Sequence, residues 1–296
     1  MNYYNEIKDK LIDNEIYERV KDYSKEINRV ITYYEVGRLL YEAGSKYGEN
    51  IIGKYAGKLV NEVGKKYHKR TLFKYRKLYI VFSNKKMPPM AAQLTYSHYQ
   101  ELLSLKDINE INYYINICIS QNLSRNELRE RIKNKEYERL DDDTKNKLIS
   151  NESTDIIDFV KNPIIIRNNL NYVNISEKVL KKLILEDLDS FLKELGEGFT
   201  YIGNEYKIKI GDRYNYIDLL LFNINFNCYV VIELKVTELK KEYIGQIITY
   251  KNYIDKNIRN NHDETIGIVI SKKDDKYIMP YCTDNRIISR EYILIK

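Results

Sequence analysis

Three charged residues interrupt two apolar runs of the chain, and their types and spacing suit metal-assisted hydrolysis. Asp218 lies within the run 216–222, while Glu233 and Lys235 lie near the end of the run 228–236. A charge inside such a run is costly unless it is paired or binds a metal ion. Two carboxylates and a lysine on neighbouring strands can satisfy one another around a divalent cation, an arrangement that suits cleavage of a phosphodiester bond.

The expected geometry of these residues comes from a hairpin. The polar segment 223–227 turns the chain, so the two runs are expected to pair as antiparallel strands with Asp218 beside Glu233. Glu233 and Lys235 are two residues apart and therefore share a face. Two carboxylates that point together repel each other unless a cation lies between them, and Mg²⁺ accepts such ligands. Lys235 would then position the attacking water or neutralise the developing anion. The alternative is a buried salt bridge from Lys235 to one of the two acids.

The elements that position these residues form the second half of the chain. Ser176 is expected to cap a long helix, 177–195, that ends at Gly196. Further strands and one helix follow from the apolar runs. The strands are expected at 199–202, 206–210, 214–222, 228–236 and 265–271, and the helix at 242–253. This order predicts an α/β layer with a mixed sheet that is covered on its faces.

The first half of the chain predicts helix after helix from about residue 15 to residue 137. Residues 54–86 contain eleven Lys or Arg and a single acid, Glu62. Such a block is typical of a surface that meets a polyanion, although a solvated helix face would look the same. A basic helix that opens at Thr71 after a short turn is similar to the second helix of a helix-turn-helix, and it is expected to stop before Met87-Pro88-Pro89. The candidate nucleic-acid-binding residues are Lys65, Lys66, Lys69, Arg70, Lys74, Arg76 and Lys77.

Length and composition predict two globular domains without a membrane span. The chain has 296 residues, 43% hydrophobic and 31% charged, with a net charge of +6. Residues 1–137 form the expected helical domain, 138–158 a charged linker without apolar periodicity, and 159–296 the α/β domain. The three scattered cysteines and the lack of a secretory signal lead us to expect a cytoplasmic protein.

The charged residues of the hairpin resemble a known signature. Asp218 followed by Glu-x-Lys at Glu233 and Lys235 is similar to the PD-(D/E)xK nuclease motif. Gln246 and Tyr250, separated by Ile-Ile-Thr, are similar to the Gln-xxx-Tyr element of the RecB-like branch of that superfamily. Residues at i and i+4 share one helix face, so both would point toward the site.

The resemblance extends over most of the chain and is closest to the YhcG-like PDDEXK nuclease-domain family. It rests on the segments 191–199, 203–205, 217–220, 231–235 and 244–246, and on the helical segments 33–38 and 94–103. It implies a restriction-endonuclease-like α/β domain with a mixed central sheet behind an all-helical N-terminal domain. It also implies a Mg²⁺- or Mn²⁺-dependent nuclease, with DNA favoured over RNA.

The same resemblance assigns roles to individual residues. It places Asp218, Glu233, Lys235, Gln246 and Tyr250 in the catalytic site, with Asp218 and Glu233 as metal ligands. A further acid is expected from the first core helix, where Glu177 is preferred over Glu186. Glu205 stands where other members of the family carry Gln, and it is an alternative metal ligand.

Two other functions fit the same sequence. The first is a catalytically silent protein that binds nucleic acid or assembles with partners on a nuclease fold. The second is a helical domain that serves for homodimerisation or for docking another protein.

Overall fold

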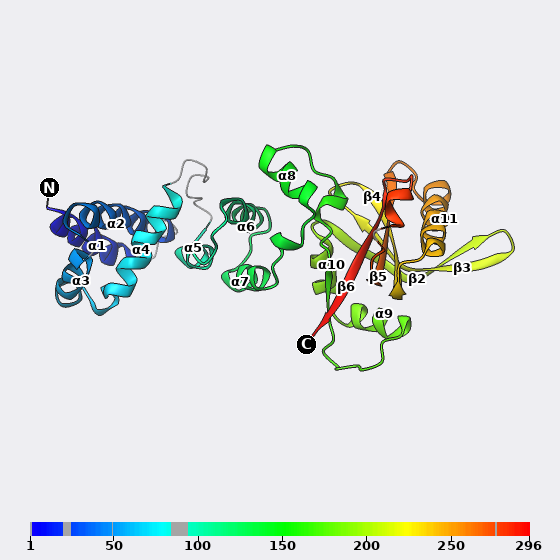
Figure 1. The fold of residues 1–296 in the computed structure, drawn as a ribbon, viewed down its shortest axis with the longest axis horizontal. Helices are drawn as coiled ribbons and strands as arrows, with labels where there is room; N and C mark the ends of the chain where they lie inside the picture. Colours follow the sequence, from blue (N-terminus) through cyan, green and yellow to red (C-terminus); the bar gives the residue numbers. More distant parts are fainter. Residues whose placement is uncertain (1, 20–24, 49, 84–93, 276) are drawn as a thin grey trace. The chain divides into compact units, whose positions relative to one another are not determined.

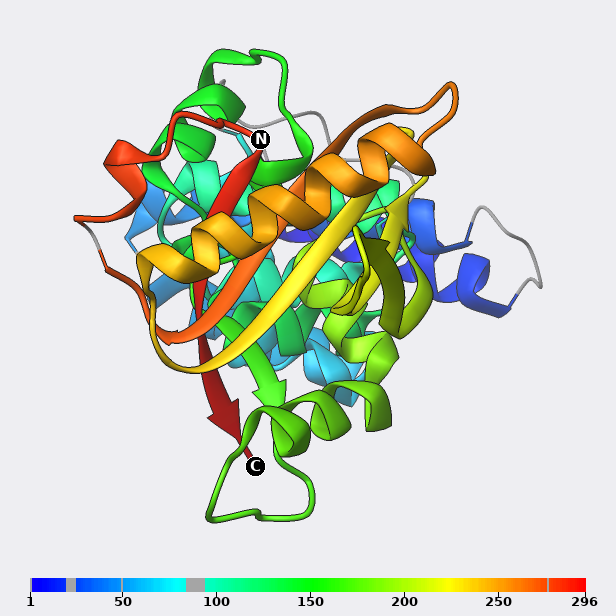
Figure 2. The same cartoon turned by 90° about the vertical axis from the view of Figure 1, so that its right-hand side faces the viewer.

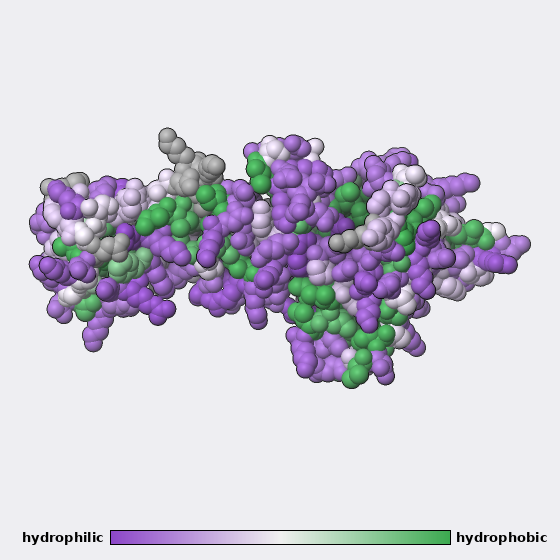
Figure 3. All heavy atoms as spheres, in the orientation of Figure 1, coloured by the Kyte–Doolittle hydropathy of each residue, from purple (hydrophilic) through white to green (hydrophobic). Residues whose placement is uncertain are grey.

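The computed structural model describes residues 2–19, 25–48, 50–83, 94–275 and 277–296. Internal contacts divide the chain into two units, Met1–Tyr137 and Glu138–Lys296. In Figure 1 the first unit is drawn from blue to green-cyan and the second from green to red. No helix among the described residues is long and apolar enough to cross a membrane, and the face drawn in Figure 3 is mainly hydrophilic.

The first unit is built from helices, as the sequence predicts. They are α1 (Tyr3–Arg19), α2 (Lys25–Tyr47), α3 (Asn50–Glu62), α4 (Lys69–Phe82), α5 (Tyr96–Leu102), α6 (Ile108–Ser120) and α7 (Arg125–Lys133). A short 3-10 helix, Lys65–Tyr67, separates α3 from α4. The expected cap at Thr71 is wrong, because His68 has extended backbone angles and α4 begins directly after it. The expected stop at Met87-Pro88-Pro89 lies outside the described residues.

Helices α2 and α4 pack closely because of one glycine. A Cβ atom on Gly37 would lie 2.1 Å from the carbonyl oxygen of Tyr75, so only glycine fits there. The approach lets the rings of Tyr33 and Tyr75 stack with centroids 4.1 Å apart, and Tyr96 of α5 packs edge-on against Tyr33. The basic helix α4 is therefore fixed in the core of this unit by its tyrosine side.

The second unit contains a six-stranded mixed sheet with the order β1-β6-β5-β4-β3-β2. Its strands are β1 (Ile164–Arg167), β2 (Phe199–Ile210), β3 (Arg213–Asn223), β4 (Cys228–Glu238), β5 (Asp263–Lys273) and β6 (Ile287–Ile295). Strands β2, β3 and β4 pair antiparallel, whereas β4, β5, β6 and β1 pair parallel. The predicted fold class, a helical unit followed by an α/β unit with a mixed sheet, is confirmed.

Helices cover both faces of this sheet. Helices α9 (Glu177–Glu186) and α10 (Leu188–Leu195) contribute to the core on one face, together with Val230, Ile232 and Leu234 of β4. Helix α11 (Lys241–Asn257) covers the other face, where it meets Val231 and Val269. Figure 2 shows α11 crossing in front of the sheet. The predicted single helix 177–195 is wrong in one respect, since Asp187 leaves the helical conformation and separates α9 from α10.

The segment expected as a linker, 138–158, is folded instead. It contains α8 (Asp142–Ser150) and the 3-10 helix Ile156–Phe159. It is attached largely by charged groups: Arg139 binds Glu194 at 2.6 Å, and the buried Arg290 of β6 binds Asp141 at 2.8 Å. Arg290 also donates to the carbonyl oxygen of Val160 at 2.8 Å. A segment that is held by ion pairs and hydrogen bonds needs few regularly spaced apolar residues. The apolar pattern of the sequence therefore did not predict that 138–158 is folded.

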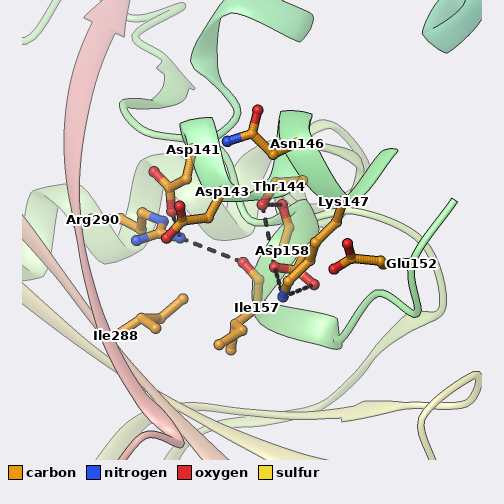
Figure 4. Close-up of a pocket in the computed structure, with 10 residues that line it drawn as sticks. All are labelled: Asp141, Asp143, Thr144, Asn146, Lys147, Glu152, Ile157, Asp158, Ile288 and Arg290. Carbon is orange, nitrogen blue, oxygen red and sulfur yellow. Dashed lines mark hydrogen bonds and ion pairs between the residues drawn. The ribbon is translucent and has the colours of Figure 1, made fainter. Parts of the chain in front are cut away.

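A pocket of about 450 Å³ lies between α8 and β6. Figure 4 shows Lys147 reaching Asp158, with both of its oxygens 2.9 Å from the ammonium group. Thr144 donates to the same aspartate. Both basic groups of this pocket are thus paired with acids that also line it, Lys147 with Asp158 and Arg290 with Asp141, and none of the candidate catalytic residues lines it.

Candidate active site

Strands β3 and β4 separate at Asp218. Their pairing runs from Asn223–Cys228 to Leu219–Ile232, and one further step would pair Asp218 with Glu233. Asp218 and Glu233 do not form this backbone pair. Instead, Oδ2 of Asp218 accepts a hydrogen bond from the backbone N–H of Leu234 at 3.0 Å. The aspartate side chain therefore bridges the opening and lies against the part of β4 that carries Glu233 and Lys235.

Strands β2 and β3 are both distorted at the level of this opening. Ile217 belongs to the core under α11, whereas Leu219 belongs to the core under α9. Residues two apart in a regular strand share a face, so β3 turns over at Asp218. On β2 the residue at the corresponding register is Glu205, whose φ is +47°. A left-handed conformation costs a residue with a side chain about 1–2 kcal/mol, so this distortion is maintained by its surroundings.

Glu233 is a buried carboxylate that is only half satisfied. Oε2 accepts a hydrogen bond from Nζ of Lys235 at 3.2 Å, while Oε1 is buried and has no hydrogen-bond partner among the described residues. Burial, and then the nearby charge of Asp218, raise the pKa of Glu233 to about 7. A carboxylate in this state gains from any cation that reaches its free oxygen.

Lys235 is held in its charged form by the acids around it. Burial disfavours the ammonium group, but Glu233, Glu177 and Asp218 outweigh that effect and raise the pKa of Lys235. Its Nζ also lies 5.1 Å from the centre of the Tyr243 ring on α11. The salt bridge from Lys235 to Glu233, one of the two pairs that the sequence left open as the alternative to a metal site, is present, and it leaves Asp218 and one oxygen of Glu233 for other partners.

Lys181 of α9 is a site residue that the sequence reasoning missed. Its Nζ lies 2.6 Å from Oδ1 of Asp218 and 3.3 Å from Oε1 of Glu205. Burial opposes its charge, yet these two acids raise the pKa of Lys181. A signal was present in the sequence, since Lys181 follows Glu177 by four residues and so shares its helix face.

The candidate helix acids lie at opposite ends of α9. Glu177 is exposed in the first turn, and its charge acts on Lys235. Glu186 is the last residue of α9 and pairs with Lys182 at 3.6 Å. Glu177 is therefore at the end of α9 whose charge reaches Lys235, and its role as the further acid stays a prediction.

Gln246 and Tyr250 contact each other on α11. Nε2 of Gln246 donates to the Tyr250 hydroxyl at 3.1 Å, and Tyr250 is 6% exposed within the core under α11. Tyr243, which meets Lys235, precedes Gln246 by three residues. This helical spacing puts the side chains of Tyr243, Gln246 and Tyr250 on one side of α11. The Tyr243 end of this row lies next to Lys235 of β4.

The donor set at the opening fits a divalent cation. Mg²⁺ and Mn²⁺ prefer carboxylate oxygens, and Asp218 and the free Oε1 of Glu233 supply them from adjoining strands. Within the described ranges, no group of three or more His, Cys, Asp or Glu side chains converges as a ready metal site. On this side of the opening, Asp218 and Glu205 instead pair with the ammonium group of Lys181.

The basic candidates of the first unit differ in their contacts. Lys66 pairs with Glu15 and Glu18, and Lys77 donates to the backbone oxygen of Leu103. Arg76 is half-buried and lies over the Tyr41 ring, while Lys69 lies near the Phe73 ring. The remaining three are exposed and form no ion pair in the described part of this unit. They are Lys65, Arg70 and Lys74.

Comparison with known proteins identifies the class and then the family. Residues 158–294 match the family model of the YhcG PDDEXK nuclease domain. Residues 11–139 match the model of the DUF1016 N-terminal domain. The second unit therefore carries a PDDEXK nuclease domain. The two matches cover most of the chain, and the chain belongs to the YhcG-like family of PDDEXK nuclease-domain proteins.

One curated relative is the protein named "Putative nuclease YhcG" of Escherichia coli (strain K12). It is 26% identical over 187 residues, which cover 61% of this chain and 48% of the relative. The chain thus spans about half the length of that protein.

Solved structures of lower similarity include a repair endonuclease from Pyrococcus abyssi. It is 19% identical with a TM-score of 0.29, covering 43% of this chain and 49% of that chain. The EndoMS–dsDNA2 complex is 18% identical with a TM-score of 0.31, covering 44% of this chain and 48% of that chain. TM-scores at this level do not define a common overall fold.

Proposed function

We propose that this protein is a metal-dependent nuclease that hydrolyses phosphodiester bonds in DNA. The observation that carries the proposal is the opening between β3 and β4. There Asp218, Glu233 and Lys235 meet, and a buried carboxylate oxygen of Glu233 lacks a hydrogen-bond partner in the part of the chain that the structure describes. The family supplies the reaction class, nuclease, while the metal and the substrate are proposals.

The roles of the residues follow from their surroundings. Asp218 and Glu233 would hold Mg²⁺ or Mn²⁺, with Glu177 or Glu205 as a further acid. The bound ion supplies an electrophile that stabilises negative charge on the phosphate during cleavage. Lys235 keeps its proton on Nζ and can donate it in a hydrogen bond to the attacking water or to a phosphate oxygen. Gln246, oriented by the Tyr250 hydroxyl, would help to hold the phosphate or the water.

The test is cleavage of labelled single- and double-stranded DNA and RNA with Mg²⁺, with Mn²⁺ and with chelator. We expect DNA cleavage with metal only, and its loss in Asp218→Asn, Glu233→Gln and Lys235→Ala. Asp189→Asn is the matched control, because Asp189 is an exposed acid on α10 that pairs with the exposed Lys193. Equal cleavage by the wild type and the three site variants would refute the proposal.

A specific observation favours one competing function. Lys181 neutralises Asp218 and Glu205 within the protein, so the fold satisfies these acids without a metal ion. A catalytically silent protein that binds nucleic acid would keep this arrangement permanently. Absence of metal binding at the opening in calorimetry, together with retained binding of nucleic acid, would select this alternative.

The first unit is proposed to bind nucleic acid through the helix–turn–helix formed by α3, Lys65–Tyr67 and α4. Lys65, Arg70 and Lys74 are the residues that support this, because their charges are exposed and not paired with acids in the described part of the unit. Neutralising all three should weaken binding and reduce its salt dependence.

The three free cysteines, Cys118, Cys228 and Cys282, fit the expected cytoplasmic setting.

A further inference from the structure

Strands β2 and β3 continue as a two-stranded arm after β3 has left β4. Their pairing extends from Tyr206–Ile217 to Ile210–Arg213, and Gly211 and Asp212 make the turn. Figure 1 shows this arm running out past α11 and the rest of the sheet. One face of the arm is anchored, since Ile208 and Ile217 are buried in the core under α11.

The opposite face of the arm carries an exposed ladder of lysines and tyrosines. Lys207 pairs across the strands with Tyr216, and Lys209 pairs with Tyr214. Tyr214 is 56% exposed and Tyr216 is 53% exposed. Nζ of Lys207 lies 3.8 Å from the centre of the Tyr214 ring. Ring faces and ammonium groups therefore alternate along one surface, which we call the arm ladder.

Strand propensity explains part of this pattern but not all of it. Tyrosine is favoured in strands, so its presence on the arm is unremarkable by itself. Exposed lysines, however, are commonly placed opposite acids, and such pairs stabilise a strand. Lys207 and Lys209 form no ion pair in the described part of the chain. The arm ladder thus offers aromatic surface together with positive charge that no acid of the described chain neutralises.

The arm ladder also leads to the candidate active site. Tyr216 precedes Asp218 by two residues on β3, a separation of about 7 Å along a strand. Ligand held on the ladder would therefore continue toward the opening between β3 and β4. This continuity distinguishes the ladder from other exposed tyrosines, such as Tyr281 on the short helix before β6.

We propose that the arm ladder binds a single strand of DNA and guides it to Asp218. The choice of DNA rests on the proposed nuclease function. Tyr214 and Tyr216 would stack on bases, and Lys207 and Lys209 would contact phosphates. A single strand is the fitting ligand because its base faces are open, whereas those of a duplex are covered by neighbouring base pairs.

The test is binding of a short fluorescent oligonucleotide to the full chain, measured by anisotropy in the presence of chelator. We expect Tyr214→Ala and Tyr216→Ala each to weaken binding of single-stranded DNA by about tenfold. Tyr216→Phe, which keeps the ring, should bind as the wild type does. Lys207→Gln and Lys209→Gln should each reduce the slope of log affinity against log salt by about 0.7.

Matched controls come from the same unit. Tyr281→Ala removes a tyrosine that is 85% exposed, and Lys272→Gln removes an exposed lysine at the end of β5. Both should bind as the wild type does. Thermal unfolding of each variant, followed by circular dichroism, shows whether a loss of binding reflects a loss of folding; Tyr216→Phe keeps the comparison valid if an alanine variant unfolds.

Three results would overturn the inference. They are unchanged binding in folded alanine variants, equal weakening by Tyr281→Ala, and tighter binding of duplex DNA or of an RNA strand than of the DNA strand. Its failure is separable from failure of the proposed function. Binding in chelator can depend on the ladder even if no cleavage occurs, and Asp218-dependent cleavage can occur even if the ladder contributes nothing to binding.

Discussion

Nζ of Lys181 lies 2.6 Å from Oδ1 of Asp218, so a lysine of the first core helix neutralises the acid that the nuclease motif assigns to metal binding. The same ammonium group reaches Glu205 on β2. In the absence of a metal ion, the protein therefore supplies its own cation to this side of the opening. A bound metal ion would have to compete with that ion pair or displace it.

The first prediction concerns this competition. Lys181→Met keeps the length and apolar stem of the side chain but removes its charge. We expect Mn²⁺ to bind the variant about fivefold more tightly than the wild type, since a partly exposed ion pair contributes on the order of 1 kcal/mol. Isothermal titration calorimetry measures the difference.

Lys182→Met is the control for Lys181→Met. Lys182 is the next residue on α9, but it pairs with Glu186 and donates to the Tyr172 hydroxyl. Its substitution should leave Mn²⁺ affinity unchanged. Weaker or unchanged affinity in Lys181→Met would show that Lys181 does not compete with the metal.

The second prediction concerns pH and the stability of the metal-free protein. The pKa of Glu233 is raised from 4.5 to about 7 in the folded state. Between these values the folded state holds a proton that the unfolded state has lost, so the free energy of unfolding falls as pH rises. Urea denaturation in chelator at about pH 5 and about pH 8 should show this loss in the wild type and a smaller loss in Glu233→Gln.

The control for the pH experiment is Glu242→Gln, which changes an exposed acid in the first turn of α11. It should retain the pH dependence of the wild type. Identical pH dependence in the wild type and in Glu233→Gln would mean that Glu233 does not titrate in this range.

The third prediction concerns the contact between Gln246 and Tyr250. Tyr250→Phe keeps the buried ring and removes the hydroxyl that accepts from Gln246. We expect cleavage to slow by about tenfold, because a misplaced polar group in a catalytic site costs on this scale. Gln246→Ala should slow cleavage similarly, and the double variant should be no slower than either, since both changes remove one interaction.

Tyr253→Phe is the matched change on the same helix, at a half-buried tyrosine whose hydroxyl forms no hydrogen bond within the described residues. Its cleavage rate should equal that of the wild type. If the effects of Tyr250→Phe and Gln246→Ala on the cleavage rate were additive, the two residues would act independently and not through their hydrogen bond.

The fourth prediction concerns the attachment of α8. Arg290→Met removes the guanidinium that binds Asp141 and the carbonyl oxygen of Val160. The carbonyl oxygen of the buried Val160 would lose this donor, and an unsatisfied buried polar group costs about 1–3 kcal/mol, so the second unit should unfold at lower urea concentration. Lys145→Met, which breaks a surface pair with Asp142, should change the free energy of unfolding by less than about 0.5 kcal/mol. Equal stability of the two variants would contradict the structural role of Arg290.

The sequence predicted the central hairpin well because its signals are local. The apolar runs around Asp218 and Glu233 and the polar turn between them define both strands and their register. The strands β1 and β6 were missed for physical reasons. The first has four residues, and the second contains Ser289 and Arg290, which are buried through hydrogen bonds rather than through apolar character.

The sequence analysis named Asp218, Glu233 and Lys235 as site residues but missed Lys181. Asp218, Glu233 and Lys235 stand out because each interrupts an apolar strand. Lys181 lies on a helix that also carries Lys178 and Lys182, and its four-residue spacing from Glu177 does not by itself show which lysine reaches the site. Its role depends on how α9 packs over the sheet, which is a long-range property of the fold. The left-handed backbone conformation of Glu205 also has no local sequence pattern that would predict it.

The contacts of Arg290 have a consequence for any attempt to isolate the nuclease domain. A fragment that began at residue 158, where the nuclease-domain match begins, would lack α8 and Asp141. It would keep a buried guanidinium whose counter-ion had been cut away. The boundary suited to expression and crystallisation is therefore residue 138, and a domain exchanged between relatives should carry its own α8 with it.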